Sequence, residues 1–115
     1  SLLKRRAQTH LIETRLKNIR YIAELTKFGN KHGAPPALAL GCLKLLLEEF
    51  KDQNIDVAAA LLEGCGRFLL CQPHTAPRTE KLLAVFMRLR RAKNLDSYKA
   101  TLVDNAYYAC KPPTG

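Results

Sequence analysis

The segment Leu61–Leu70, LLEGCGRFLL, places Gly64 and Gly66 on either side of Cys65. Glycines at this spacing can form a turn whose backbone amides bind phosphate, if a strand precedes them and a helix begins after them. Here the apolar spacing predicts a helix that begins about ten residues earlier and continues past both glycines. Its amides are then already hydrogen-bonded. The pair therefore predicts a close approach between helices, and Gly41 is a further candidate for such a contact.

Cys71 and His74 form the nearest match to a catalytic or metal-binding group. A thiol and an imidazole can act as nucleophile and base, and together with Cys65 they approach a zinc ligand set. Neither pattern is complete, because no Cys-x-x-Cys pair or Ser-His-Asp arrangement is recognisable and His10 and His32 lie far away in the sequence. We therefore expect no catalytic residue, no metal and no cofactor. Free thiols are expected at Cys42, Cys65, Cys71 and Cys110.

Basic residues are concentrated at the two ends of the chain, and the net charge is +9, from 19 Lys and Arg against 10 Asp and Glu. Cations near the end of a helix either complement its negative terminus or bind a polyanion or an acidic protein, and both interpretations stay open. RNA binding would be weak, non-specific and salt-dependent, because Trp is absent and most aromatics fall on core stripes. The candidate contacts to a partner or to RNA are Arg78, Lys81, Arg88, Arg90, Arg91, Lys93 and Tyr108.

Apolar residues recur at three- and four-residue steps along the whole chain, which predicts an all-α fold. Glycine- and proline-containing breaks separate the helices, and Asn54 and Thr75 are suited to N-cap positions. About five to six helices are expected: Leu2–Gln8, Thr9–Phe28 up to a loop at Gly29–Gly33, one after Pro35-Pro36, one capped by Asn54, one capped by Thr75, and one from about Ser97.

The connections between these helices are short, so neighbouring helices must run antiparallel. Antiparallel pairs stacked side by side form an α-solenoid, or a compact bundle if the array is short, and 115 residues hold at most one small domain or part of a larger one, with no internal domain boundary. No apolar run reaches the roughly 18 residues needed to span a bilayer. The chain begins with Ser1 rather than methionine, which suggests a segment excised from a longer protein. An uncovered end helix of such a segment predicts a dimer through its apolar face.

Two local patterns predict contacts of single side chains. Arg67 follows Glu63 by four residues, a spacing that favours an intrahelical ion pair, which Glu24 and Lys27 can join from a neighbouring helix. Adjacent helical positions face different directions, so Tyr107 is expected in the core and Tyr108 is expected to expose its hydroxyl.

Four blocks of sequence, Glu24–Phe28, Leu61–Glu63, Cys65–Phe68 and Asn105–Tyr108, resemble the scaffold family of nonsense-mediated mRNA decay. The similarity runs from about Ile12 to Pro113. It implies stacked HEAT-like helix pairs, with residues 1–115 as the C-terminal half of the second of three middle domains of initiation factor 4G type. It also implies that Gly66 matters more than Gly64. The structural motif comprises Glu24, Lys27, Phe28, Glu63, Gly66, Arg67, Phe68, Asn105 and Tyr107.

The resemblance implies a non-catalytic scaffold that spaces neighbouring domains and docks partner proteins of the decay machinery. For the whole protein it implies contacts with the RNA helicase of the pathway, with a partner associated with exon junctions and with the kinase that phosphorylates the helicase. A cytoplasmic, perinuclear location is the matching expectation. The alternative is a basic RNA-binding helical module of translation initiation or ribosome assembly. That alternative requires the basic residues of both ends to form one continuous ridge.

Overall fold

A computed structural model describes residues 2–28 and 33–113, and all regular structure in these ranges is helical. The all-α prediction is therefore confirmed. The helices are α1 (Leu2–Lys27), α2 (Pro36–Glu48), α3 (Gln53–Cys71), α4 (Ala76–Ala92) and α5 (Ser97–Cys110).

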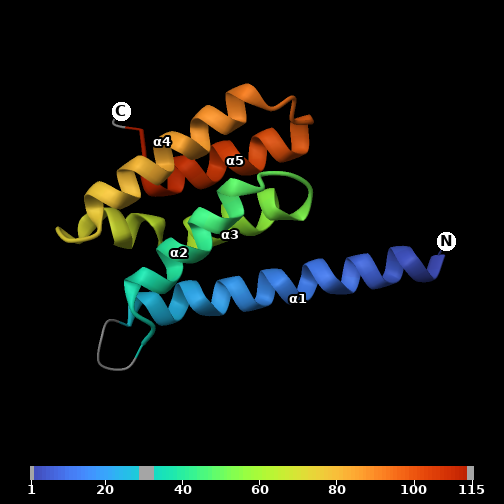
Figure 1. Cartoon of the computed structure of the whole chain (residues 1–115), viewed down its shortest axis with the longest axis horizontal. Helices are drawn as coiled ribbons and strands as arrows, with labels where there is room; N and C mark the ends of the chain where they lie inside the picture. Colours follow the sequence, from blue (N-terminus) through green and yellow to red (C-terminus); the bar gives the residue numbers. More distant parts are fainter. Residues whose placement is uncertain (1, 29–32, 114–115) are drawn as a thin grey trace.

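The helices form two layers, with α1, α3 and α5 side by side in one layer and α2 and α4 in the other (Figure 1). Consecutive helices alternate between the layers and run in opposite directions. Helix α3 packs against all the other helices, whereas the backbone of α1 comes close only to those of α2 and α3. This alternation is the arrangement expected of a solenoid-like fragment.

The first helix is continuous from Leu2 to Lys27, so the predicted break after Gln8 is wrong. The residues at that point, Ala7-Gln8-Thr9-His10, include neither glycine nor proline, and each can continue a helix. The glycine-bounded loop expected at Gly29–Gly33 lies mostly outside the described residues.

Of the two predicted N-cap residues, Asn54 lies inside its helix and Thr75 occupies the N-cap position with a different hydrogen-bond partner. Helix α3 begins two residues earlier than expected, after Asp52, which has a positive φ of 50°. Asn54 lies in the first turn, where its side-chain amide donates to the carbonyl oxygen of Glu49 at 2.9 Å. Thr75 does occupy the N-cap position of α4, but its hydroxyl donates to the Leu69 carbonyl oxygen at 2.7 Å. That bond satisfies an acceptor near the end of α3.

Helix α3 supplies the centre of the hydrophobic core. Around it, Phe86 of α4 packs edge-on against Phe50 with ring centroids 5.7 Å apart. The buried hydroxyls of Thr26 and Thr79 each donate to the carbonyl oxygen four residues earlier at 2.8 Å, so neither is left without a partner. The buried residues of α3 are Ile55, Val57, Ala58, Ala59, Leu61, Leu62, Cys65, Gly66 and Leu69.

Gly64 and Gly66 lie where α3 touches its two neighbours in the layer. Residues two positions apart on a helix are rotated by about 200°, so they face nearly opposite directions. A methyl group at Gly64 would lie 2.5 Å from Cβ of Ala23 on α1, and one at Gly66 would lie 2.3 Å from Sγ of Cys110 on α5. The predicted close approach is confirmed, and Gly64 is as crowded as Gly66. The suggestion for Gly41 is wrong, because a methyl group there would have no neighbour within 4 Å.

We expect Gly64→Ala to lower the free energy of unfolding by up to about 2 kcal/mol. Overpacking against Ala23 costs about 1–3 kcal/mol, and the gain in helix propensity, roughly 1 kcal/mol, offsets only part of it. Urea denaturation followed by circular dichroism measures the difference in the free energy of unfolding, since the chain has no tryptophan for fluorescence.

Two further variants control this experiment. Gly41→Ala has the same chemistry without a steric neighbour, so it should stabilise the chain by about 0.5–1 kcal/mol. Combining Gly64→Ala with Ala23→Gly leaves one methyl group at the contact and should restore most of the lost stability. A Gly64→Ala chain as stable as the Gly41→Ala chain would contradict the packing described above.

Candidate interaction surface on helices α4 and α5

Helix α4 carries five basic residues and one acidic residue. Lys81, Arg88 and Arg91 follow one another at steps of seven and three residues, so they share one exposed face, which we call the basic face of α4. Arg78 and Lys93 are also exposed. Within the described residues, an ion pair or a side-chain hydrogen bond is found for none of the side chains of Arg78, Lys81, Arg88, Arg91 and Lys93. Their charges are therefore available to another molecule.

Arg90 has a different role from the other cations of α4. Its Nε lies 2.8 Å from Oδ1 of Asp104 on α5, and its Nη2 lies 3.0 Å from Oδ2. This two-pronged contact holds the pKa of Asp104 below its usual value and raises the pKa of Arg90. Arg90 thus joins α4 to α5, and its guanidinium is not free for the partner contact expected from the sequence.

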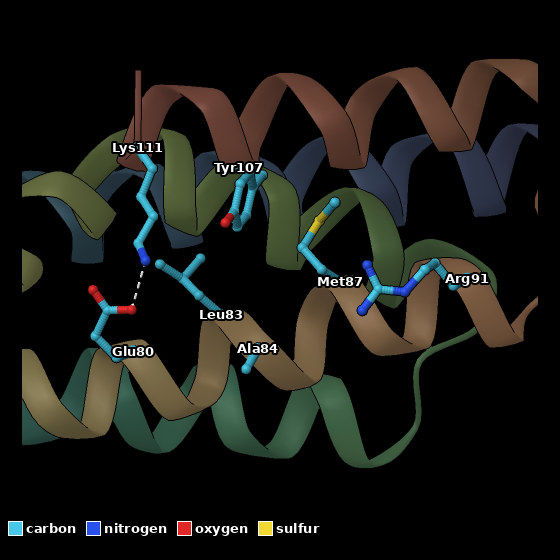
Figure 2. Close-up of a pocket in the computed structure, with 7 residues that line it drawn as sticks. All are labelled: Glu80, Leu83, Ala84, Met87, Arg91, Tyr107 and Lys111. Atoms are coloured by element: carbon cyan, nitrogen blue, oxygen red, sulfur yellow. Dashed lines mark hydrogen bonds and ion pairs between the residues drawn. The ribbon is translucent and has the colours of Figure 1, made fainter. Parts of the chain in front are cut away.

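A groove of about 320 Å³ runs between α4 and α5 beside the basic face (Figure 2). At one end the carboxylate of Glu80 pairs with the ammonium group of Lys111 at 2.6 Å. Arg91 lies at the other end, with Met87 and Tyr107 between them in this view. The lining residues are Glu80, Leu83, Ala84, Met87, Arg91, Tyr107 and Lys111.

Glu80, Met87 and Lys111 were not among the candidates from the sequence. Glu80 and Lys111 are 31 residues apart, so no helical spacing relates them, and only the packing of α5 on α4 brings them together. The pairing raises the pKa of Lys111. The one available signal was Met87, the single methionine of the chain, because methionine often lines adaptable binding surfaces.

Tyr107 lines this groove, and Tyr108 is the next residue on α5. Tyr107 is half-buried and packs against the core, whereas the side chain of Tyr108 is 53% exposed. Their rings meet edge-on with centroids 5.8 Å apart. Tyr108 is therefore accessible to another molecule, as predicted. Asn105 is exposed and makes no side-chain hydrogen bond in the described structure.

The ion-pair network predicted around Arg67 is wrong. Glu63 and Arg67 are both exposed and do not pair within the described chain, while Glu24 and Lys27 pair with each other at 2.8 Å on α1. Exposed pairs contribute only about 0–1 kcal/mol, too little to fix long side chains in water.

The two aromatic residues of the structural motif lie in different environments. Phe28 follows the end of α1 and is 69% exposed, whereas Phe68 packs against the core. Phe28 therefore has no packing role among the residues that the structure describes.

The basic residues of the two ends do not form one ridge. The backbones of α1 and α4 do not come close to each other, and α3 lies between α1 and the α4–α5 pair (Figure 1). The continuous basic surface that the RNA-binding alternative requires is thus not found in the described structure.

No reactive group is assembled around Cys71 and His74. Both are exposed, and no hydrogen bond joins them. Within residues 2–28 and 33–113, no three His, Cys, Asp or Glu side chains come close enough to hold a metal ion. Burial raises the pKa of Cys65 to about 11 and that of Cys110 to about 12. None of the helices described here is both long and apolar enough to cross a bilayer.

Comparison with known proteins relates this chain to the decay pathway inferred from the sequence. "Regulator of nonsense transcripts UPF2" of Arabidopsis thaliana is 50% identical over 113 residues, which is 98% of this chain and 9% of that protein. "Regulator of nonsense transcripts 2" of Homo sapiens is 46% identical over 104 residues, 89% of this chain and 8% of that protein. "Nonsense-mediated mRNA decay protein 2" of Schizosaccharomyces pombe is 37% identical over 112 residues, 97% and 10% respectively.

The resemblance inferred from the four sequence blocks is therefore confirmed. The chain spans about a tenth of the length of the curated relatives it matches. No protein-family model matches the chain.

We expect the four thiols to react with Ellman's reagent in distinct phases at about pH 8. A thiol with a pKa near 11 is about one part in a thousand thiolate at that pH, and Cys65 and Cys110 are also buried, so both should react only after unfolding. Cys71 is exposed and should react first, and Cys71→Ser should remove that phase. Four equal rates in the folded chain would contradict this burial.

The Arg90–Asp104 contact predicts a pH-dependent contribution to stability. The pKa of Asp104 is lower in the folded state, so the contact stabilises the fold above the unfolded pKa of about 3.9 and loses this effect as the pH falls through the folded pKa. Asp104→Asn should therefore lower the urea midpoint at neutral pH and have little effect in strong acid. Glu13→Gln, at an exposed carboxylate without an ion pair in the described chain, should change neither.

Proposed function

We propose that this chain, a homologue of one segment of the regulators of nonsense transcripts 2, is a non-catalytic scaffold and protein-docking module of nonsense-mediated mRNA decay. The relatives' names support the pathway, at 37% to 50% identity over most of the chain. The observation that carries the docking role is the basic face of α4. Its cations are exposed, lack intramolecular partners in the described structure and lie beside an apolar groove.

The packing of α3 supports the spacing part of this role. A scaffold must hold its docking surface in a fixed position. Helix α3 packs against the four other helices, and at Gly64 and Gly66 it approaches α1 and α5 too closely for a side chain to fit between them. Arg90 and Lys111 of the docking region are themselves tied across the α4–α5 interface. The docking surface is therefore formed by tightly packed helices and not by a loop.

The finer parts of the proposal come from the resemblance. Residues 1–115 would be the C-terminal half of a middle domain of initiation factor 4G type, working in the cytoplasm and near the nucleus. The helicase, the exon-junction-associated partner and the kinase would be engaged through the full-length protein. A dimer would use the exposed apolar side chains of α1 and α2, among them Tyr21, Leu38 and Leu45.

RNA binding remains the second candidate because of the net charge of +9. The separation of the α1 and α4 cations on different parts of the molecule argues against a single phosphate-binding ridge. A protein partner can use the basic face of α4 alone, since charge complementarity needs only a local patch.

We expect the combined substitutions Lys81→Glu, Arg88→Glu and Arg91→Glu, made in the tagged full-length protein, to abolish the co-purification of partner proteins from the cells in which it naturally occurs. Charge reversal converts attraction of an acidic surface into repulsion without touching the core. Quantitative mass spectrometry of the co-purified proteins measures the loss.

The matched control reverses three exposed cations of α1 that form no ion pair in the described structure: Arg6→Glu, Lys17→Glu and Arg20→Glu. It makes the same change in net charge at a distance from α4 and should retain the partners. Retention of all partners by both variants, or a loss only of RNA, would overturn the docking proposal.

A further inference from the structure

The floor of the α4–α5 groove is apolar and adaptable. Leu83 is 1% exposed and forms its base, and Met87 is half-buried beside it. Ala84 lies exposed at the edge, where a small side chain lets another backbone approach closely. The volume of about 320 Å³ is at the lower limit of ligand pockets, enough for one or two side chains of a peptide.

The rim of the groove carries one uncompensated charge. Glu80 and Lys111 neutralise each other at 2.6 Å, as the dashed line in Figure 2 marks. Arg91 is exposed and has no ion-pair partner among the described residues. Arg88 lies one turn away on the same face and adds to the positive potential. The groove therefore favours a ligand that combines an apolar side chain with a carboxylate.

Protein fits this surface better than RNA. Phe86, the one aromatic residue of α4, is buried, and Tyr107, the one aromatic residue that lines the groove, is half-buried, so the groove holds no fully exposed ring on which bases could stack. A phosphate backbone would also gain nothing from the floor formed by Leu83 and Met87. An amphipathic helix can use both the floor and Arg91, because its apolar and acidic residues recur at neighbouring turns.

We propose that the groove between α4 and α5 binds an acidic amphipathic helix of a partner protein, with an apolar side chain on Leu83 and Met87 and a carboxylate on Arg91. This inference rests on the proposed docking function, for which it identifies the site and the chemistry of the ligand. The neighbouring cations of the basic face guide the approach of the acidic segment and make its binding sensitive to salt.

The test begins with the 115-residue chain and a phage-displayed library of random peptides about four helical turns long. Selected peptides should be rich in Asp and Glu, with apolar residues three or four positions apart, and should bind less tightly at high salt. Their binding should shift the amide resonances of Ala84, Met87 and Tyr107. Peptides without acidic residues, or shifts confined to other helices, would overturn the proposal.

Three variants, each lowering the net charge by one, then separate the effect of the groove from that of the net charge of the chain. Ala84→Glu blocks and repels at the groove edge and should weaken binding at least about tenfold. Arg91→Gln should weaken it about three- to tenfold. Lys17→Gln, on α1 and outside both the groove and the basic face, should change it by less than about twofold. Equal effects of all three would overturn the groove as the site.

Oligouridylate RNA serves as the competing probe. Under the proposal it should bind weakly, and Ala84→Glu should leave that binding nearly unchanged. RNA that shifts the same amides and displaces the peptides would favour a nucleic-acid surface and overturn the proposal. If charge reversal of the basic face removes partner proteins in cells while Ala84→Glu does not, the groove inference fails and the docking function stands.

Discussion

Helix α3 packs closely against α1 on one side and against α5 on the other, and the arrangement of the other helices follows from these two contacts. Two glycines, rotated by about 200° from each other, remove the side chains that would keep these helices apart. At the resulting distances an added methyl group would lie 2.5 Å from Ala23 or 2.3 Å from Cys110. Each glycine costs roughly 1 kcal/mol of helix propensity. Close packing of apolar side chains along three neighbouring helices must offset that cost.

The position of α5 determines which charges remain free. Because α5 packs closely on α3, its polar side chains reach specific partners: Asp104 meets Arg90, Lys111 meets Glu80, and Lys99 pairs with Asp56 of α3. These contacts use one cation of α4 and its single carboxylate. The cations of the basic face have no counterpart on α5, so they stay exposed. The division between structural and available charges on α4 thus follows from helix packing.

Close packing also relates the fold to the proposed function. A docking surface made by two helices keeps its shape only if the helices keep their separation, and here α4 and α5 are joined by two ion pairs and by their common contact with α3. The adaptable element of the surface is Met87, whose unbranched side chain can adjust to a ligand without movement of the backbone. The support is rigid, and only the side chains need to accommodate a partner.

The amino-acid sequence alone predicts the helical class, most helix ends and the close approach at Gly64 and Gly66, because these depend on periodicity, on proline and glycine and on side-chain size. It also determined the resemblance to the decay proteins, which depends on the order of residues alone. Contacts between residues far apart could not be predicted. Arg90 and Arg91 are adjacent cations at the end of one helix, and nothing local indicates that one binds Asp104 while the other stays free.

The packing of the helices determined which residues share a surface. It separated the basic residues of α1 from those of α4, left Phe28 exposed, and left Arg67 outside the ion pair of Glu24 and Lys27. It also formed the α4–α5 groove from residues as far apart as Glu80 and Lys111. The physical reason is that periodicity fixes the face of each helix on which a side chain lies. The rotation and separation of neighbouring helices, which set every contact between them, depend on the packing of the whole core.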